Sequence, residues 1–130
     1  MNSAVLIVDD EPLIRETLAE MLSGIGLDVL EAADSATALD VLKKRAHQVS
    51  VLVTDVRMPG AMDGLDLANI AQNSWPWIQV IVMSAHYETG PDRLPPNARY
   101  LTKPWQSHDM VESVRRALSE FRGMQTASTH

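Results

Sequence analysis

The chain has 130 residues, a formal net charge of −6 and 45% hydrophobic residues, which fits one domain with a core of its own. It has no cysteine, which excludes disulfides and thiolate metal sites, and its acidic balance argues against a nucleic-acid backbone as partner. No apolar stretch approaches the roughly 18 residues that span a bilayer, and Met1–Asp10 does not resemble a signal peptide. We therefore expect a soluble, cytoplasmic protein without membrane contacts.

Short aliphatic runs alternate with segments of helical spacing in the first half of the chain. The run Ala4–Val8 predicts a strand buried on both faces. A helix is expected to begin near Pro12 and to end at Gly24 and Gly26. The mixed segment Leu27–Leu30 is typical of an edge strand. A second helix follows, capped by Asp34 or Ser35 and carrying Leu39, Leu42 and Ala46 on one face.

The second half repeats the pattern with one interruption. Strands are predicted at Val49–Thr54 and Ile78–Met83, with a helix from about Asp63 to Ala71 between them. From His86 to Arg99, four glycine and proline residues make a regular fourth helix improbable, so we expect it to be short or absent. A short strand at Tyr100–Thr102 and a last helix, capped by Ser107 and ending just before Gly123, complete the series. We expect a domain over residues 1–123 and a flexible tail over 124–130.

This alternation predicts an α/β fold, a doubly wound five-stranded parallel sheet with helices on both faces. In such sheets functional residues gather beyond the carboxyl ends of the strands. Here the predicted strands end in Asp9 and Asp10, in Asp55, in Ser84 and in Lys103.

Carboxylates so close together repel one another by about 4 kcal/mol per pair at 4 Å and an effective dielectric near 20. Their oxygen ligands favour Mg²⁺ or Mn²⁺, and Lys103 suits an oxygen of a tetrahedral oxyanion. Singly, each residue also has an ordinary structural interpretation: a helix cap, a turn residue, a loop hydroxyl or a surface lysine. Their joint placement at four strand ends favours a shared site.

Four motifs, in this order, closely resemble the receiver domains of two-component response regulators. They are Val8–Pro12, Thr54–Gly60, Met83–Ala85 and Tyr100–Pro104, and the resemblance covers about residues 3–122. It implies a flavodoxin-like sheet with strand order 2-1-3-4-5. It also implies a signalling switch, not an enzyme acting on other substrates, that takes a phosphoryl group from a phosphohistidine kinase or a small phosphodonor in a Mg²⁺-dependent reaction.

The resemblance assigns a role to each site residue. Asp55 would be the phospho-acceptor. Asp10, Asp55 and the backbone carbonyl of Arg57 would bind the metal directly, and Asp9 would act through a water molecule. Ser84 and Lys103 would bind phosphoryl oxygens.

Three further positions follow from the same resemblance. Tyr100 would be the aromatic switch residue that responds to Ser84, and the Lys103–Pro104 peptide bond would be cis. Arg57 and His86 flank the acceptor and the switch hydroxyl, so they are expected to tune the phosphoryl lifetime. Our hypotheses are that Arg57 shields the phosphoryl group and that phosphorylation orders the 86–99 loop.

The expected partners are a sensor histidine kinase or phosphotransfer protein, and a downstream protein or second copy bound through the 86–122 face. The chain would be either a single-domain regulator or the N-terminal part of a longer one. A metal-dependent phosphatase is disfavoured because Arg57 stands where that class places a second acid. A degenerate receiver that only binds proteins remains an alternative.

Overall fold

The computed structural model describes residues 4–84 and 95–128, with side chains described up to Arg122. In chain order the elements are β1 (Ala4–Val8), α1 (Pro12–Gly24), β2 (Asp28–Ala32), α2 (Ser35–Arg45), the 3-10 turn η1 (Ala46–Gln48), β3 (Val49–Asp55), α3 (Gly64–Ser74), β4 (Gln79–Ser84), β5 (Arg99–Thr102) and α4 (Ser107–Ser128). The five strands form one sheet in the order β2-β1-β3-β4-β5, and every neighbouring pair is parallel. The predicted fold class and strand order are confirmed.

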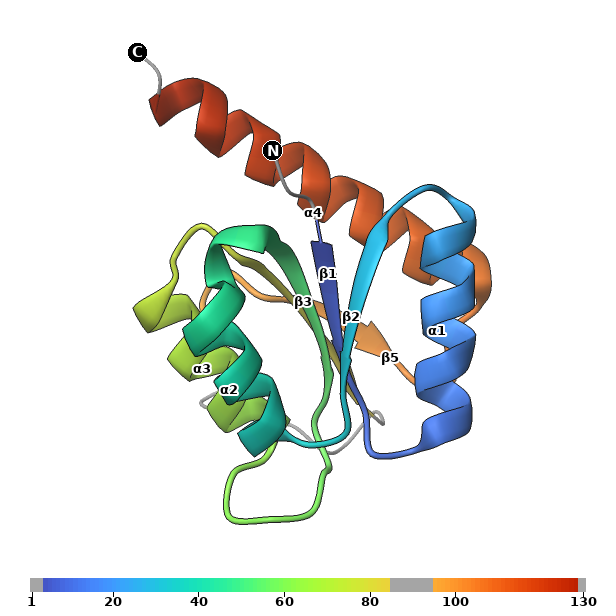
Figure 1. The fold of residues 1–130 in the computed structure, drawn as a ribbon. Helices are drawn as coiled ribbons and strands as arrows, with labels where there is room; N and C mark the ends of the chain where they lie inside the picture. Colours follow the sequence, from blue (N-terminus) through green and yellow to red (C-terminus); the bar gives the residue numbers. More distant parts are fainter. Residues whose placement is uncertain (1–3, 85–94, 129–130) are drawn as a thin grey trace.

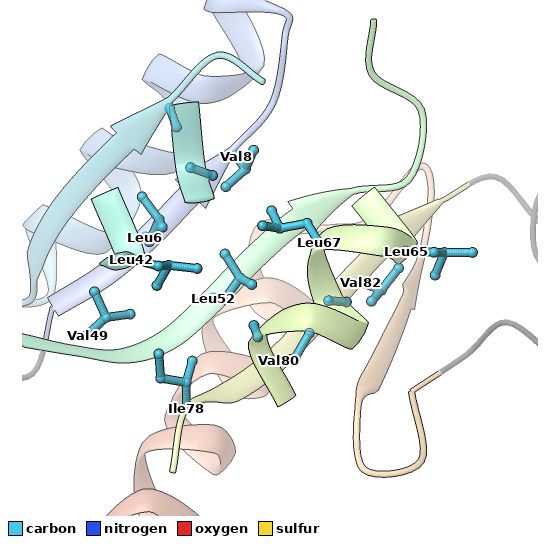
Figure 2. Close-up of a cluster of buried hydrophobic side chains, with 14 of the residues drawn as sticks. Leu6, Val8, Leu42, Val49, Leu52, Leu65, Leu67, Ile78, Val80 and Val82 are labelled. Atoms are coloured by element: carbon cyan, nitrogen blue, oxygen red, sulfur yellow. The ribbon is translucent and has the colours of Figure 1, made fainter. Parts of the chain in front are cut away.

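The sheet separates two hydrophobic clusters because successive strand residues point to opposite faces. On β1, Leu6 and Val8 belong to one cluster, whereas Val5 and Ile7 belong to the other. Helices α2 and α3 cover the first face and α1 and α4 the second (Figure 1). Figure 2 shows the first cluster, in which side chains from the central strands meet those of α2 and α3.

Local sequence signals account for both ends of α1 and for the start of α2 and of α3. Pro12 occupies the first turn of α1, and Gly26, with φ of +91°, reverses the chain after it. Asp34, not Ser35, caps α2 by accepting a hydrogen bond from the backbone of Thr37 at 2.7 Å. Asp63 caps α3 through a reciprocal capping box.

The C-terminal helix is longer than the sequence predicted. Helix α4 continues through Gly123 to Ser128, so the expected end before Gly123 is wrong. One glycine inside a helix costs about 1 kcal/mol relative to alanine, which is too little to end a helix that no proline follows. The mobility of residues 124–130 stays a prediction.

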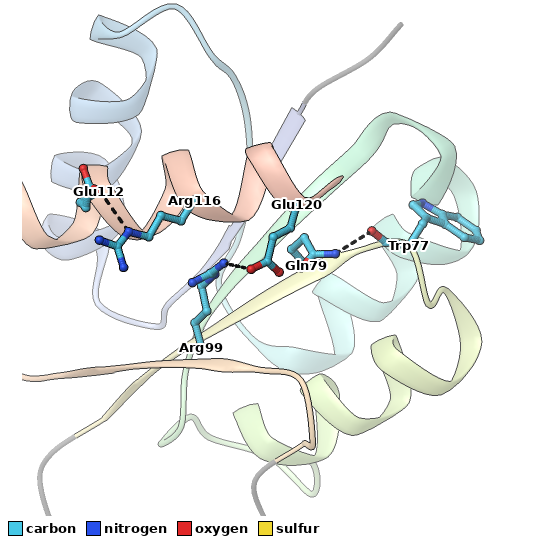
Figure 3. A network of polar contacts seen from close by, with 6 residues as sticks. All are labelled: Trp77, Gln79, Arg99, Glu112, Arg116 and Glu120. Atoms are coloured by element: carbon cyan, nitrogen blue, oxygen red, sulfur yellow. Dashed lines mark hydrogen bonds and ion pairs between the residues drawn. The ribbon is translucent and has the colours of Figure 1, made fainter. Parts of the chain in front are cut away.

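The segment expected to replace a fourth helix is described only in part. Residues 95–98 form a turn without a helix, and residues 85–94 lie outside the described residues, as does most of the expected loop. After this turn, an ion pair joins Arg99 of β5 to Glu120 of α4 (Figure 3). The edge strand is thereby attached to the helix that packs behind it.

Replacement of a central core residue should test this packing. Leu52 lies fully buried in the middle of β3, so Leu52→Ala should lower the free energy of unfolding by about 2 to 5 kcal/mol in urea titrations. Leu13 is 75% exposed, and Leu13→Ala should change it by only about 0.5 kcal/mol or less. Similar losses for both variants would contradict the described core.

Candidate functional site

Three carboxylates converge at the carboxyl ends of two neighbouring strands. Asp9 and Asp10 follow β1, and Asp55 is the last residue of β3. One carboxylate oxygen from each lies within 4.8 Å of the others. Asp9 and Asp55 are buried and Asp10 is exposed, so the cluster has a closed side and an open side.

Asp9 is the most confined member of the cluster. Its backbone N–H donates to Ala32 of β2 at 3.2 Å, and its Oδ1 accepts from the backbone of Glu11 at 2.9 Å. Its Oδ2 is buried and has no hydrogen-bond partner among the described residues. Burial raises the pKa of the Asp9 carboxyl, and the nearby charge of Asp55 raises it further, while the hydrogen bond from Glu11 opposes both.

Arg15, which the sequence analysis did not assign to the site, contacts the backbone of Asp9. Arg15 of α1 donates from Nη1 to the backbone oxygen of Asp9 at 2.7 Å. Its Nε lies 3.3 Å from Oε1 of Glu31 on β2. No local sequence motif predicts this contact, because the loop, the helix and the second strand come together only in the folded chain.

Lys103 brings a positive charge to Asp55. Its Nζ lies 3.1 Å from Oδ2 of Asp55. Its backbone N–H donates to the carbonyl of Ser84 at 2.9 Å, which fixes the start of the loop after β5. The peptide bond from Lys103 to Pro104 is cis.

Ser84 and Tyr100 connect the same edge to β5. Ser84 ends β4 and is fully buried, and its hydroxyl forms a hydrogen bond with the hydroxyl of Tyr100. Tyr100 is partly buried on the neighbouring strand. The structure therefore places these two residues in direct contact beside Lys103.

Two grooves flank the acidic cluster. One, of about 420 Å³, is lined by Asp10, the exposed Arg57 and the β3–α3 loop. The other, of about 570 Å³, is mainly apolar and lies beside Lys103, between α1 and Trp105. A larger polar groove of about 610 Å³ lies near Gln79 at the start of β4, at the opposite end of the strands, and contains none of the predicted site residues. His86 lies outside the described residues.

The donor atoms of the cluster fit a hard divalent cation. All three side chains offer oxygen, which Mg²⁺ and Mn²⁺ prefer, and no cysteine exists in the chain to attract softer metals. The buried Oδ2 of Asp9, unpartnered among the described residues, points to a ligand that those residues do not supply. Lys103 is the ammonium that the described structure pairs with this cluster, through Asp55.

These features define a class of protein: a doubly wound α/β domain with an acidic pocket where the strand order reverses between β1 and β3. The model of the response regulator receiver domain family matches residues 5–115 of the chain. The chain belongs to this family, whose members are phosphorylation-controlled signalling switches of two-component systems.

Curated relatives and solved structures agree with this assignment. The DNA-binding transcriptional regulator NtrC of Escherichia coli is 35% identical over 93% of this chain. The positive alginate biosynthesis regulatory protein of Pseudomonas aeruginosa is 37% identical over 87% of it. The crystal structure of NtrX from Brucella abortus matches with 28% identity and a TM-score of 0.86 over 98% of the chain.

These relatives are much longer than the matched region. The chain covers 26% of NtrC, 46% of the alginate regulator and 30% of the NtrX structure. A two-component transcriptional regulator AraC from Clostridium phytofermentans matches more evenly, over 97% of this chain and 99% of that one, with 29% identity and a TM-score of 0.83. No helix among the described residues is long and apolar enough to cross a membrane.

The raised pKa of Asp9 predicts that the acidic cluster destabilises the metal-free protein. The native state binds the Asp9 proton more tightly than the unfolded state does. The free-energy cost of the buried Asp9 charge is therefore absent well below the ordinary pKa of 3.8 and complete above the raised pKa. In EDTA at pH 7, Asp9→Asn should therefore raise the free energy of unfolding by about 1 to 2 kcal/mol. The gain should shrink as the pH of the urea titration falls towards 3.8.

The control is Asp40→Asn, which removes an exposed carboxylate from α2, outside the cluster. It should leave the stability nearly unchanged at either pH. An Asp9→Asn variant that is less stable than wild type at pH 7 in EDTA would contradict the unfavourable burial of this charge.

Proposed function

We propose that the chain accepts a phosphoryl group on Asp55 and thereby switches its contacts with other proteins. The observation that carries this proposal is the meeting of three carboxylates with Lys103 at one sheet edge. The match to the receiver family supports it. The chain would act on itself only, through its own phosphorylation and dephosphorylation.

The proposed reaction is an in-line displacement at phosphorus. A carboxylate oxygen of Asp55 attacks the phosphorus, a new P–O bond forms, and the P–N bond to the donor histidine breaks. The imidazole leaves with the electron pair; with acetyl phosphate the acetate leaves in its place. Such a transfer needs little covalent help from the protein, because positioning and charge neutralisation supply most of the rate.

Two side chains are placed to neutralise the transferred group. Lys103, now 3.1 Å from the acceptor carboxylate, would pair with one phosphoryl oxygen. The hydroxyl of Ser84 would bind another, which requires it to leave or share its hydrogen bond with Tyr100. Phosphorylation would thus change the contact between β4 and β5.

We assign the metal to Asp10, Asp55 and the backbone carbonyl of Arg57, with Asp9 acting through a water molecule. Mg²⁺, or Mn²⁺ in its place, would neutralise charge on the acceptor and on the phosphoryl oxygens. The open side of the cluster at Asp10 gives the ion access from solvent.

The partners follow from the same site. A sensor histidine kinase or phosphotransfer protein would present its phosphohistidine to the open edge near Asp55. A downstream protein, or a second copy, would bind the 86–122 face, which carries β5 and most of α4. We propose no direct contact of this chain with nucleic acid, although the NtrC relative is described as DNA-binding.

Acetyl phosphate provides a direct test of the acceptor. Wild-type protein incubated with acetyl phosphate and Mg²⁺ should gain the mass of one phosphoryl group, and EDTA should prevent the gain. Asp55→Asn removes the nucleophile and should not be labelled. Labelling that persists in Asp55→Asn would reassign the acceptor. If wild type is not labelled even with a matched kinase, the chain is a degenerate receiver that only binds proteins.

Arg57 should control how long the phosphoryl group survives. It is exposed and lines the groove beside Asp10, so its guanidinium would shield the aspartyl phosphate from water. We expect Arg57→Ala to speed autodephosphorylation several-fold. This is on the order of the rate change that the loss of one charge-assisted hydrogen bond produces. Arg122, exposed on α4, provides the control variant Arg122→Ala. Equal decay rates for wild type and Arg57→Ala would rule out the shielding role.

A further inference from the structure

The backbone carbonyl of Asp55 is enclosed on two sides. Thr54, which is fully buried, donates from Oγ1 to this oxygen at 2.9 Å. Gly64, the first residue of α3, approaches it so closely that an added Cβ would lie 1.7 Å from the oxygen and 2.7 Å from its carbon. Only glycine fits this position without movement of the backbone.

Further hydrogen bonds hold the next peptide unit in place. The N–H of Val56 donates to Met83 of β4 at 3.0 Å, and the oxygen of Val56 accepts from the N–H of Gly64 at 2.8 Å. The chain that leaves β3 is therefore fixed between β4 on one side and the start of α3 on the other. Because Gly64 begins a helix with a capping box, it belongs to a rigid element.

We propose that Thr54 and Gly64 are positioning residues for phosphoryl transfer. Neither touches the reacting atoms; both fix the backbone from which the acceptor carboxylate of Asp55 and the carbonyl of Arg57 project. A backbone shift at Asp55 would move its carboxylate away from Lys103 and disturb two of the assigned metal ligands together. This inference rests on the proposed function, since it concerns the geometry of the same site.

Two properties distinguish this role from ordinary packing. A packing defect lowers stability but leaves the dependence of the labelling rate on Mg²⁺ unchanged. A positioning defect raises the Mg²⁺ concentration for half-maximal labelling and also lowers the rate at saturating Mg²⁺, because both the ligand set and the in-line geometry are disturbed. The thermal midpoint of unfolding reports packing separately.

The hydroxyl of Thr54 can be removed with little change in shape. Thr54→Val should lower the rate of labelling by acetyl phosphate at saturating Mg²⁺ about fivefold to tenfold, the effect of one buried hydrogen bond. It should also weaken Mg²⁺ binding in calorimetric titrations of the unphosphorylated protein. Thr54→Ser keeps the hydroxyl and should restore both values to within about twofold of wild type.

Gly64→Ala tests the close approach itself. The added Cβ would force the backbones of Gly64 and Asp55 apart by more than an ångström, so the rate of labelling by acetyl phosphate should fall by about 100-fold. Gly24→Ala is the matched control, because a Cβ at Gly24 meets nothing within 4 Å and the residue ends α1. It should label at the wild-type rate.

The outcomes separate this inference from the proposed function. Labelling of wild type, but not of Asp55→Asn, establishes the function regardless of the two positioning residues. If Thr54→Val then matches wild type in rate and in Mg²⁺ affinity, the positioning role is wrong. A folded Gly64→Ala variant with wild-type kinetics would also overturn the positioning role. If Gly64→Ala does not fold, Thr54→Val alone decides.

Discussion

Mutual repulsion among Asp9, Asp10 and Asp55 is the constraint on which the rest of the site depends. Their oxygens lie within 4.8 Å of one another, and two of the three side chains are buried. Burial of the Asp9 charge and its repulsion by Asp55 both disfavour the ionised cluster, with burial the larger effect. Lys103 offsets part of this cost. Arg15 donates a hydrogen bond to the backbone of Asp9 and forms an ion pair with Glu31, so it supports the geometry more than it neutralises the cluster.

The fold can carry this unfavourable cluster because the strands that lead to it, β1 and β3, are buried along their whole length. Every residue of β1 and β3 is buried, and the two hydrophobic clusters enclose them from both faces. Because parallel strands end at the same edge of the sheet, the residues that follow them are held close together. The stability contributed by the hydrophobic core thus offsets the charge repulsion at the sheet edge, which a bound cation would reduce.

Much of the fold and site follows from the sequence because the strands end in polar residues that interrupt clear apolar runs. Asp55 and Ser84 were expected to follow their strands and are the final strand residues, which leaves their position at the sheet edge unchanged. Gly123 misled the helix prediction because one glycine is a weak stop signal. Arg15 and Gly64 could not be assigned from spacing, since their contacts with Asp9 and Asp55 exist only after the elements pack.

A phosphorylation signal must leave the acidic edge through contacts that differ between two states. The hydrogen bond between the hydroxyls of Ser84 and Tyr100 joins β4 to β5 at this edge, and under the proposed function a phosphoryl group on Asp55 would compete for the Ser84 hydroxyl or share it. Tyr100 lies on β5 next to Arg99, which is paired with Glu120 of α4. The C-terminal helix α4 packs against both β4, which carries Ser84, and β5, which carries Tyr100. Under the proposed function, a movement of Tyr100 would therefore act at β5 and α4, the described elements of the proposed binding face.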